Sequence, residues 1–442
     1  MKYVVQQAGW AGAFEIAGLA LRYGLILLIA RLLGPHGLGL YALALAFANG
    51  ATALAAFGLD QATLRFIPYH RVREQSGEIV GLSLFATILV GTLASTVGLA
   101  LFLGAPGIEA LWGQPGLSNA VRIIAIAIPF TALGQVWHGA LKGFQHIRLA
   151  VFLKQIMLPL TTIVGLLTIH LIRPGEPISA VGSAALAYWV VGLISLIYVA
   201  RRVRQIDSTP VYQPATWMKF ALPMSLEGGL LFLVLWTDHL MIGWLLNAND
   251  VGIYMSVVRV AAFVALPLLA VNAVFGPMVA SLHAQGDRAT LQRLYSRLSW
   301  CTALLGSCIA IFLWATGQWV LGIFGPAFLA GHLALMILIA GQAVNSCTGS
   351  SGLVLGMTGR AGWRLMNAAI TAGLNVALNL LLIPQWGIAG AAVATAVSLG
   401  TINVLQVIEV RWLVGLSAFD WKSLGFKADP VADIGSEPEV IA

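Results

Sequence analysis

Ionisable side chains occur inside long apolar stretches of this sequence. Arg259 follows Ser256 in one such stretch, and no acidic residue lies within a helical turn of it. In another, Glu15 and Arg22 are seven residues apart and share one helical face. An ionisable group at bilayer depth costs roughly 2.5–3.5 kcal/mol on insertion scales and usually faces protein or water. Arg259 is therefore predicted to line a cavity, whereas Glu15 and Arg22 form either a functional pair or an ion pair that holds helices together.

Two acids share a third apolar stretch. Glu227 and Asp238 are eleven residues apart, about three helical turns, which places them on nearly the same face. Three interpretations of Asp238, which His239 follows, remain open: a solvated residue at a helix end, a partner of Arg259 across the turn, or a protonatable site for ion coupling. Glu15, Glu227 and Asp238 are the candidates for ion coupling.

Amides recur at helical spacing near the C-terminus. Asn367, Thr371, Asn375 and Asn379 follow one another at a strict spacing of four residues, and Gln342 and Asn345 lie on an earlier stretch. Such faces can join helices by hydrogen bonds or line a wet cavity that binds hydroxyl-rich ligands. Two such faces in one half favour the cavity. The corresponding candidates in the first half are Asn49, Gln61, Gln135 and His138.

Composition identifies a membrane protein. Of 442 residues, 59% are hydrophobic and 9% are charged, against roughly 25% charged in soluble domains. The net charge of +7 is spread between apolar runs rather than clustered on one face, so nucleic acid is not an expected partner. The three cysteines lack metal-ligand or disulfide spacing. Motifs of hydrolases, zinc proteases and P-loop ATPases are absent from the sequence, so we expect neither an enzyme nor a cofactor.

The apolar runs predict twelve transmembrane helices, because about 20 residues cross the hydrocarbon core. The first run is too long for the core of a signal peptide and is expected to remain as a span. Nineteen of the 24 Lys and Arg residues fall on the side of the N-terminus, which predicts that both termini are cytoplasmic. The expected spans are 9–33, 37–59, 78–103, 118–140, 150–172, 178–200, 217–246, 251–282, 298–324, 328–355, 364–384 and 387–414.

The two halves of the chain repeat one another. An offset of 213 residues places Gly39 on Gly252 and Tyr41 on Tyr254, in the turn after the first span of each half. Both copies begin on the same side, so the repeat is parallel, about an axis along the membrane normal. The sequence thus predicts an all-α polytopic protein with two pseudo-symmetric six-helix lobes. The expected division is an N-terminal lobe (1–200), a cytoplasmic linker (201–216), a C-terminal lobe (217–414) and a short cytoplasmic tail (415–442).

Several ordered phrases resemble a known family. They include "ARLLGPHGLGLYALA" (30–44), "GLDQATLRFIP" (58–68) and "NVALNLLLIPQWGIAGAAVATAVS" (375–398). Over nearly the whole chain the sequence is similar to the polysaccharide-biosynthesis branch of the multidrug/oligosaccharidyl-lipid/polysaccharide (MOP) exporter superfamily. The resemblance implies a MATE-like bundle in the bacterial inner (cytoplasmic) membrane that flips undecaprenyl-diphosphate-linked oligosaccharide to the periplasmic leaflet. It also implies membrane lipids, a polysaccharide polymerase and glycosyltransferases as partners. Many members of the branch have two further C-terminal spans, which are not among the twelve spans expected here.

The resemblance also implies a cationic central cavity. Arg22 and Arg259 are the residues that would supply it, with Arg65 near the cytoplasmic mouth. Arginine remains charged and offers planar donors to phosphate oxygens. The amides of the C-terminal half, with Asn345, Asn375 and Asn379 as the candidates, would then face the sugars.

Two other functions remain open. A cation-coupled multidrug exporter of the same superfamily would need a carboxylate-rich cavity, for which Glu15, Glu227 and Asp238 are available, although the unpaired Arg259 argues against it. A non-transporting scaffold of a glycan-assembly complex is the other alternative.

Overall fold

The described part of the chain is helical. The computed structural model describes residues 2–420, and this part contains helices and no strand. Eleven of its helical segments are long and apolar enough to cross a membrane. The predicted all-α membrane fold is therefore confirmed, and the difference from the expected twelve spans lies in the first helix.

The first helix, α1 (Lys2–Ala56), carries the first two expected spans. The membrane-length part of it has 44 residues, about 66 Å at 1.5 Å per residue, which is twice the thickness of a hydrocarbon core. Gly34 interrupts it with φ 66° and ψ −171° and is followed by Pro35. Glycine adopts a positive φ without steric penalty. The interruption divides α1 into two spans, so eleven segments give twelve crossings.

The rest of the N-terminal half packs around α1 and α4. Between α5 and α6 the chain forms a π-helix at residues Leu153–Met157 instead of continuing as an α-helix. The helices are α2 (Leu59–Val72), α3 (Ser76–Trp112), α4 (Leu117–Gly143), α5 (Ile147–Phe152), α6 (Leu158–Ile172) and α7 (Ser179–Arg204).

The C-terminal half forms a second bundle of similar design. Its eighth expected span is divided between α9 and α10 by a short 3-10 turn, and its tenth between α12 and α13. The helices are α9 (Ala248–Ala261), α10 (Leu266–Gln285), α11 (Arg288–Phe324), α12 (His332–Thr348), α13 (Ser351–Met357), α14 (Ala361–Trp386) and α15 (Ile388–Glu409).

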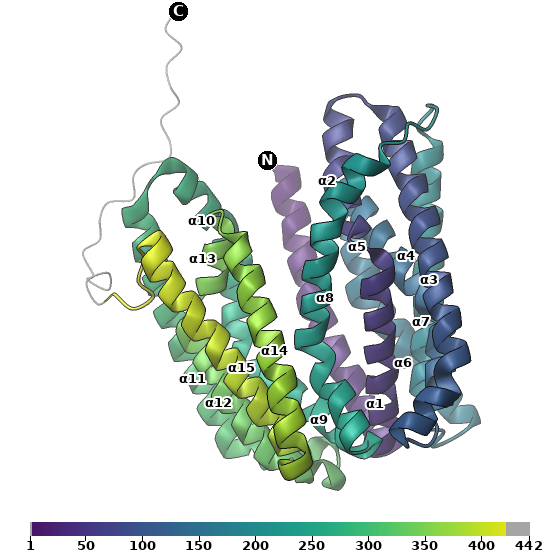
Figure 1. Cartoon of the computed structure of the whole chain (residues 1–442), viewed down its shortest axis with the longest axis vertical. Helices are drawn as coiled ribbons and strands as arrows, with labels where there is room; N and C mark the ends of the chain where they lie inside the picture. The colour runs from purple at the N-terminus through teal and green to yellow at the C-terminus, as the bar shows by residue number, and fades with distance from the viewer. Residues whose placement is uncertain (1, 421–442) are drawn as a thin grey trace, which may run out of the picture.

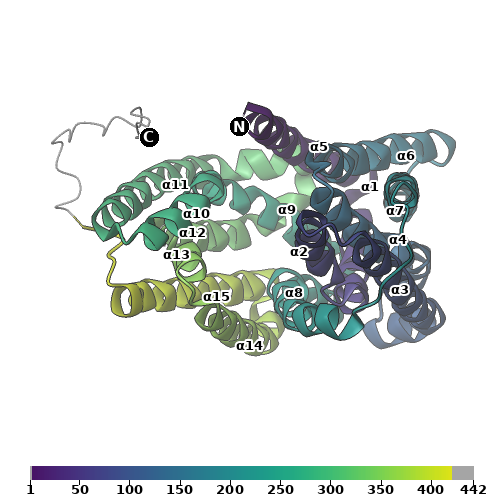
Figure 2. The ribbon, with the colours of Figure 1, turned by 90° about the horizontal axis from the view of Figure 1, so that it is seen from above.

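Helix α8 (Pro214–Leu245) belongs to both bundles. Near its start, Trp217 and Ala221 are fully buried among N-terminal-half side chains. Near its end, Asp238 contacts Asn375 and Asn379 of α14. Both views place α8 between α14 and the helices α2 and α3 (Figure 1, Figure 2). The expected lobe boundary falls at the start of this helix, whereas the packing changes partners partway along it.

The two lobes diverge toward the end of the molecule at which α1 begins and α15 finishes, here called the inner end (Figure 1). They meet at the opposite, outer end, where α1 packs against α9. A bridge across this contact is made by Gln114, whose amide nitrogen donates to the carbonyl of Leu246 at 3.1 Å and whose oxygen accepts from the Ala248 nitrogen at 2.8 Å. The outer end is therefore held closed by hydrogen bonds between the lobes.

The inner end of the C-terminal lobe includes the start of the expected tail. The Ser417 nitrogen donates to Gln292 at 2.8 Å, and the Asp420 nitrogen donates to Ser296 at 3.0 Å, so this segment packs on α11. The remainder of the expected tail, 421–442, lies outside the described residues.

Candidate functional site

The structure brings Arg22 and Arg259 to one cavity. Both side chains line a hollow of about 200 Å³ between the lobes, together with Tyr41, Tyr188 and Trp236. Arg22 comes from α1 and Arg259 from α9, which are adjacent helices from different halves of the chain. Two residues separated by more than half of the chain thus give the cavity positive charge from both lobes.

The guanidinium of Arg259 is free to accept a ligand. Its Nε atom is buried, and within the described range no side-chain or backbone acceptor bonds it. The backbone at Arg259 is fixed instead, because the Tyr23 hydroxyl donates to its carbonyl oxygen at 2.8 Å and the Tyr23 ring stacks on Phe263 at 4.5 Å. An unpaired buried charge is costly. An anion in the cavity would supply the missing partner.

Arg22 and Glu15 are joined through a third residue. The Arg22 Nη1 atom donates to the Gln155 Oε1 atom, and the Gln155 Nε2 atom donates to the Glu15 Oε2 atom at 2.5 Å. Arg22 and Glu15 line different hollows, of about 200 and 250 Å³ respectively. The relay through Gln155 holds the arginine in place while leaving it at the cavity wall.

A third cation at this site is Lys154, which is one of the nineteen Lys and Arg residues expected on the side of the N-terminus. It lies in the π-helix Leu153–Met157 and lines three hollows, including the one with Arg22 and Arg259. Single π-helical turns within α-helices occur often at functional sites. Its position four residues inside the expected span 150–172 was the available signal, but sequence does not reveal the π-helix that directs the lysine inward.

Neutral polar side chains from the N-terminal half connect these hollows. Asn49 lines three of them and Gln135 also lines three, the largest having a volume of about 450 Å³. His138 lines two and contacts the Ser195 hydroxyl at 3.5 Å. The predicted first-half candidates Asn49, Gln61, Gln135 and His138 therefore all lie at cavity walls.

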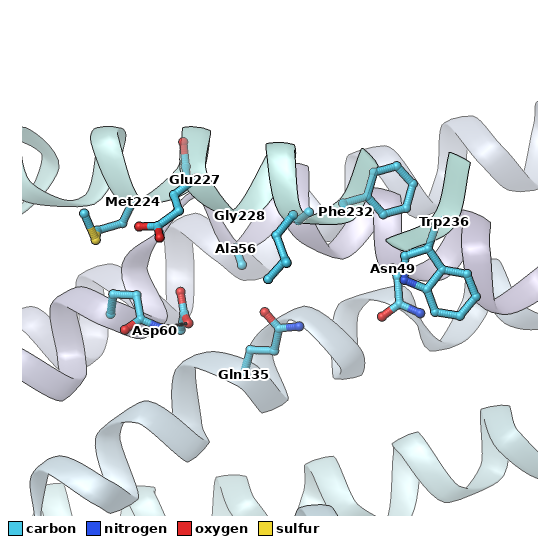
Figure 3. Close-up of a pocket in the computed structure, with 14 residues that line it drawn as sticks. Asn49, Ala56, Asp60, Gln135, Met224, Glu227, Gly228, Phe232 and Trp236 are labelled. Carbon is cyan, nitrogen blue, oxygen red and sulfur yellow. Dashed lines mark hydrogen bonds between the residues drawn. The ribbon is translucent and has the colours of Figure 1, made fainter. Parts of the chain in front are cut away.

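Two acids face each other across the cavity of about 450 Å³. Glu227 on α8 and Asp60 on α2 point toward the space from opposite walls, and Gln135 and Trp236 complete it (Figure 3). The Glu227 carboxylate is 3.9 Å from the Arg364 guanidinium, and both side chains are exposed. An exposed pair of this kind contributes little to stability. The cavity system is thus acidic and amide-rich near α2 and cationic between α1, α9 and the π-helix.

Arg65 lies away from the other cations. Its guanidinium carbon is 4.5 Å from the centre of the Phe220 ring of α8 and 5.6 Å from that of Phe66. Stacking on two aromatic rings gives the exposed guanidinium of Arg65 favourable cation–π interactions. The structure therefore does not bring Arg65 together with Arg22 and Arg259.

Asp238 is buried rather than solvated and does not pair with Arg259, which corrects two of the three open interpretations. It is 6% exposed. Its Oδ1 atom accepts from Asn379 at 2.7 Å and from Asn375 at 3.1 Å, and its Oδ2 atom accepts from the Tyr254 hydroxyl at 2.7 Å and from Thr395. Arg259 is not among these partners. Four donors from α9, α14 and α15 thus surround one carboxylate of α8.

The amide face of α14 points into the C-terminal lobe. Asn375 and Asn379 are 4% and 0% exposed and bind Asp238, so in this conformation they do not face the cavity of Arg22 and Arg259. Asn345 accepts from Asn403 at 3.1 Å and donates to Gln342 at 3.2 Å. The spacing predicted the shared face, whereas the neighbours that cover it depend on tertiary packing.

Metal-ligand clusters and disulfides are not found in the described region. No group of three or more His, Cys, Asp or Glu side chains there could hold a metal ion. Cys301, Cys308 and Cys347 are free.

Comparison with known proteins gives a family match over more than half of the chain. The family described as polysaccharide biosynthesis protein matches residues 4–283. The chain is 26% identical over 211 residues to the probable low-salt glycan biosynthesis flippase Agl15 of Haloferax volcanii, an alignment covering 48% of this chain and 44% of that protein. It is 21% identical to the succinoglycan biosynthesis transport protein ExoT of Rhizobium meliloti, over 93% of this chain and 80% of that protein.

Solved structures show the same fold. An inward-facing multidrug resistance MATE family transporter of the MOP superfamily superposes with a TM-score of 0.74 at 15% identity, covering 90% of this chain and 94% of that one. The lipid II flippase MurJ superposes with a TM-score of 0.72 at 13% identity, covering 93% and 88%. The predicted MATE-like fold is thereby confirmed. With a family match over residues 4–283, the chain belongs to the polysaccharide biosynthesis protein family.

Proposed function

We propose that this protein flips undecaprenyl-diphosphate-linked oligosaccharide from the cytoplasmic to the periplasmic leaflet for surface polysaccharide assembly. The observation that carries the proposal is the unpartnered guanidinium of Arg259 at a cavity shared with Arg22 and Lys154. A diphosphate cannot enter hydrocarbon unaccompanied, and three cations from two lobes can neutralise it. Membership of a family of polysaccharide-biosynthesis proteins supports the same substrate class.

The neighbouring cavities suit the rest of the substrate. With the diphosphate at Arg22 and Arg259, the sugars extend into the cavity of about 450 Å³ that Asn49, Gln61 and Gln135 line. Amides both donate and accept hydrogen bonds, as sugar hydroxyls require. The polyprenyl chain remains in lipid between the lobes. Asn375 and Asn379 are assigned to the ion site around Asp238 rather than to the sugars.

Transport proceeds by alternating access. The headgroup enters at the inner end, where the lobes diverge, and leaves after the contact between α1 and α9 at the outer end opens. A membrane potential that is negative inside favours outward movement of an anion by about 2.3 kcal/mol per charge per 100 mV. The empty cations repel one another as they return to the inward-facing state, and a cation bound at Asp238 drives this reset.

The Lys and Arg distribution supports cytoplasmic termini in the bacterial inner membrane. A polymerase and glycosyltransferases are the proposed protein partners, because they consume and supply the flipped glycan.

The test uses full-length protein in liposomes with a fluorescent undecaprenyl-diphosphate disaccharide as the probe. Arg259→Ala should abolish translocation while the protein still inserts and accumulates, and Arg259→Lys should retain part of the activity because it keeps the charge without the planar donors. Arg173→Ala removes an exposed arginine at the end of α6 and serves as the control. Full activity of Arg259→Ala overturns the proposal.

Export of cationic drugs is a second candidate. The facing acids Glu227 and Asp60 favour it, because a carboxylate-lined cavity attracts cations (Figure 3). A deletion strain that becomes sensitive to cationic drugs while its surface glycan is unchanged would support this function over the first. A protein that moves neither substrate in liposomes would instead agree with a scaffold role.

A further inference from the structure

A second buried carboxylate lies in the C-terminal lobe. Glu409, at the inner end of α15, is 8% exposed and accepts a hydrogen bond from Asn367 of α14 at 2.6 Å. Among the described residues, no Lys, Arg or His forms an ion pair with it. Asn367 and Asn375 occupy the same face of α14 two turns apart, and Asn375 binds Asp238. Two acids thus bind the same polar face at different depths.

Helices α14 and α15 carry buried hydroxyls without partners at positions between the residues that bind the two acids. Thr371 lies between Asn367 and Asn375 on α14, and Ser398 lies between Thr395 and Glu409 on α15. They are 4% and 3% exposed, and neither hydroxyl has a hydrogen-bond partner within the described chain.

Two amide oxygens at the ends of this region are equally unsatisfied. They belong to Asn367 and Asn379, which are both fully buried. A buried polar atom without a partner costs about 1–3 kcal/mol. Buried water or a bound ion usually fills such a site.

Simple joining of helices does not account for this pattern. A hydrogen bond between Asn367 and Glu409 would join α14 to α15 without help from Thr371 or Ser398. Alanine or valine at those positions would pack the helices without unsatisfied atoms. The residues with unsatisfied atoms instead all lie on α14 and α15, which pack against each other, and residues on α14 also bind the two carboxylates.

We propose that Glu409, Asn367, Thr371 and Ser398 form an inner path through which the coupling cation reaches Asp238, and this inference rests on the ion-coupling role proposed for Asp238. Asn367 and Asn375 are separated by about 12 Å along the helix, so one hydrogen bond cannot connect the acids. The hydroxyls provide intermediate oxygen ligands or carry a chain of water. The ligand is a monovalent cation, either H⁺ or Na⁺.

Dicyclohexylcarbodiimide provides the probe, because it modifies a buried carboxyl group that is protonated and not occupied by a metal cation. Purified full-length protein is first equilibrated without the reagent. The reagent is then added together with a rapid change of conditions, and the modification of Asp238 is followed over time by mass spectrometry. One arm removes Na⁺ at constant pH by dilution into choline buffer. The other lowers the pH from 8 to 6 without Na⁺. The arm in which Asp238 modification responds identifies the cation.

Glu409→Gln, Thr371→Val and Ser398→Ala should each slow the response at Asp238 at least tenfold while leaving its final extent unchanged. Thr401→Val is the matched control, since Thr401 is on α15 but is not buried, and its hydroxyl is bound to its own helix at Val397. The two single-hydroxyl variants keep the test decisive if Glu409→Gln fails to fold.

The outcomes separate this inference from the proposal on which it rests. Unchanged response rates in all three variants overturn the inner path and leave Asp238 as the coupling site. A wild-type protein in which neither Na⁺ nor pH alters Asp238 modification overturns the coupling role and the path together. Neither result affects the anion site, which translocation by Arg259→Ala tests separately.

Discussion

Gly39 and Gly252 face each other where α1 meets α9: a Cβ atom on Gly252 would lie 2.9 Å from the backbone nitrogen of Gly39. The contact is reciprocal. A Cβ on Gly39 would collide with the carbonyl of Ala248, and one on Gly252 with the carbonyl of Pro35. The sequence offset of 213 that relates Gly39 to Gly252 also relates Pro35 to Ala248. The repeated sequence, which starts at Pro35 in one half and at Ala248 in the other, therefore forms both sides of one self-complementary contact.

Gly252→Ala should destabilise the closed outer end. Forced overpacking of this kind costs about 1–3 kcal/mol, which shifts the population toward outer-open states roughly 5- to 150-fold. Spin-label distances between the outer ends of the lobes should therefore lengthen. Gly24→Ala is the control, because no atom lies within 4 Å of its Cβ position. Unchanged distances in Gly252→Ala would show that the contact does not hold the outer end closed.

Lys154→Gln should weaken binding of the diphosphate probe by about 10- to 150-fold, the range for loss of one charged hydrogen bond. Lys154→Arg should bind more tightly than Lys154→Gln. Fluorescence titration of the labelled lipid in detergent measures both. Lys219→Gln removes a positive charge from an exposed position near the start of α8 and should bind like the wild type. Equal weakening by the two glutamine variants would mean that only overall charge matters.

Comparing the affinities of a monophosphate probe and a diphosphate probe should show whether the cationic cavity binds both phosphates. With one phosphate removed, fewer of the cations Arg22, Lys154 and Arg259 have a ligand, so affinity should fall. Arg259→Ala should then reduce the preference for diphosphate over monophosphate. The ratio of the two dissociation constants, measured for each variant, gives the result. A ratio that stays constant would place the second phosphate elsewhere.

Tyr254→Phe removes the hydroxyl that donates to Asp238 at 2.7 Å. We expect a loss of about 1–2 kcal/mol in stability and a change in the Na⁺ concentration or pH at which the melting temperature shifts. Tyr295→Phe is matched, since that buried hydroxyl bonds Ser351 at 2.7 Å, away from Asp238. It should lower the melting temperature without changing the cation dependence. The same cation dependence in both variants would contradict the role of Asp238.

Asp287, outside the spans, should make the start of α11 sensitive to acid. Hydrogen bonds from Thr290, including its backbone nitrogen at 3.0 Å, lower the pKa of the Asp287 carboxyl. Its stabilising effect is therefore present above the ordinary pKa of 3.8 and disappears as the pH falls through the lower folded value. In Asp287→Asn the side chain can still cap the start of α11 but does not titrate, so this dependence of stability on pH should be absent. Hydrogen exchange at the first turn of α11 between pH 6 and 3 should differ between the two proteins.

The sequence predicted the spans because apolar length and the distribution of positive charge are local properties. It also identified Arg259, since an arginine without a nearby acid is visible in one helix. Lys154 was missed because a π-helix changes its direction only in the folded lobe. The face shared by Asn375 and Asn379 was correctly inferred from spacing, but its partner Asp238 comes from a helix that packs there only in three dimensions.

The shared position of α8 has a consequence for motion. Its beginning is anchored in the N-terminal lobe through Trp217, and its end is anchored to α14 through Asp238. Between them, Gly228 and Gly229 have no atoms near their Cβ positions. When the lobes rotate, this helix cannot follow both as a rigid rod, so its curvature must change. The bend angle of α8 would therefore report how far each molecule has progressed through its cycle.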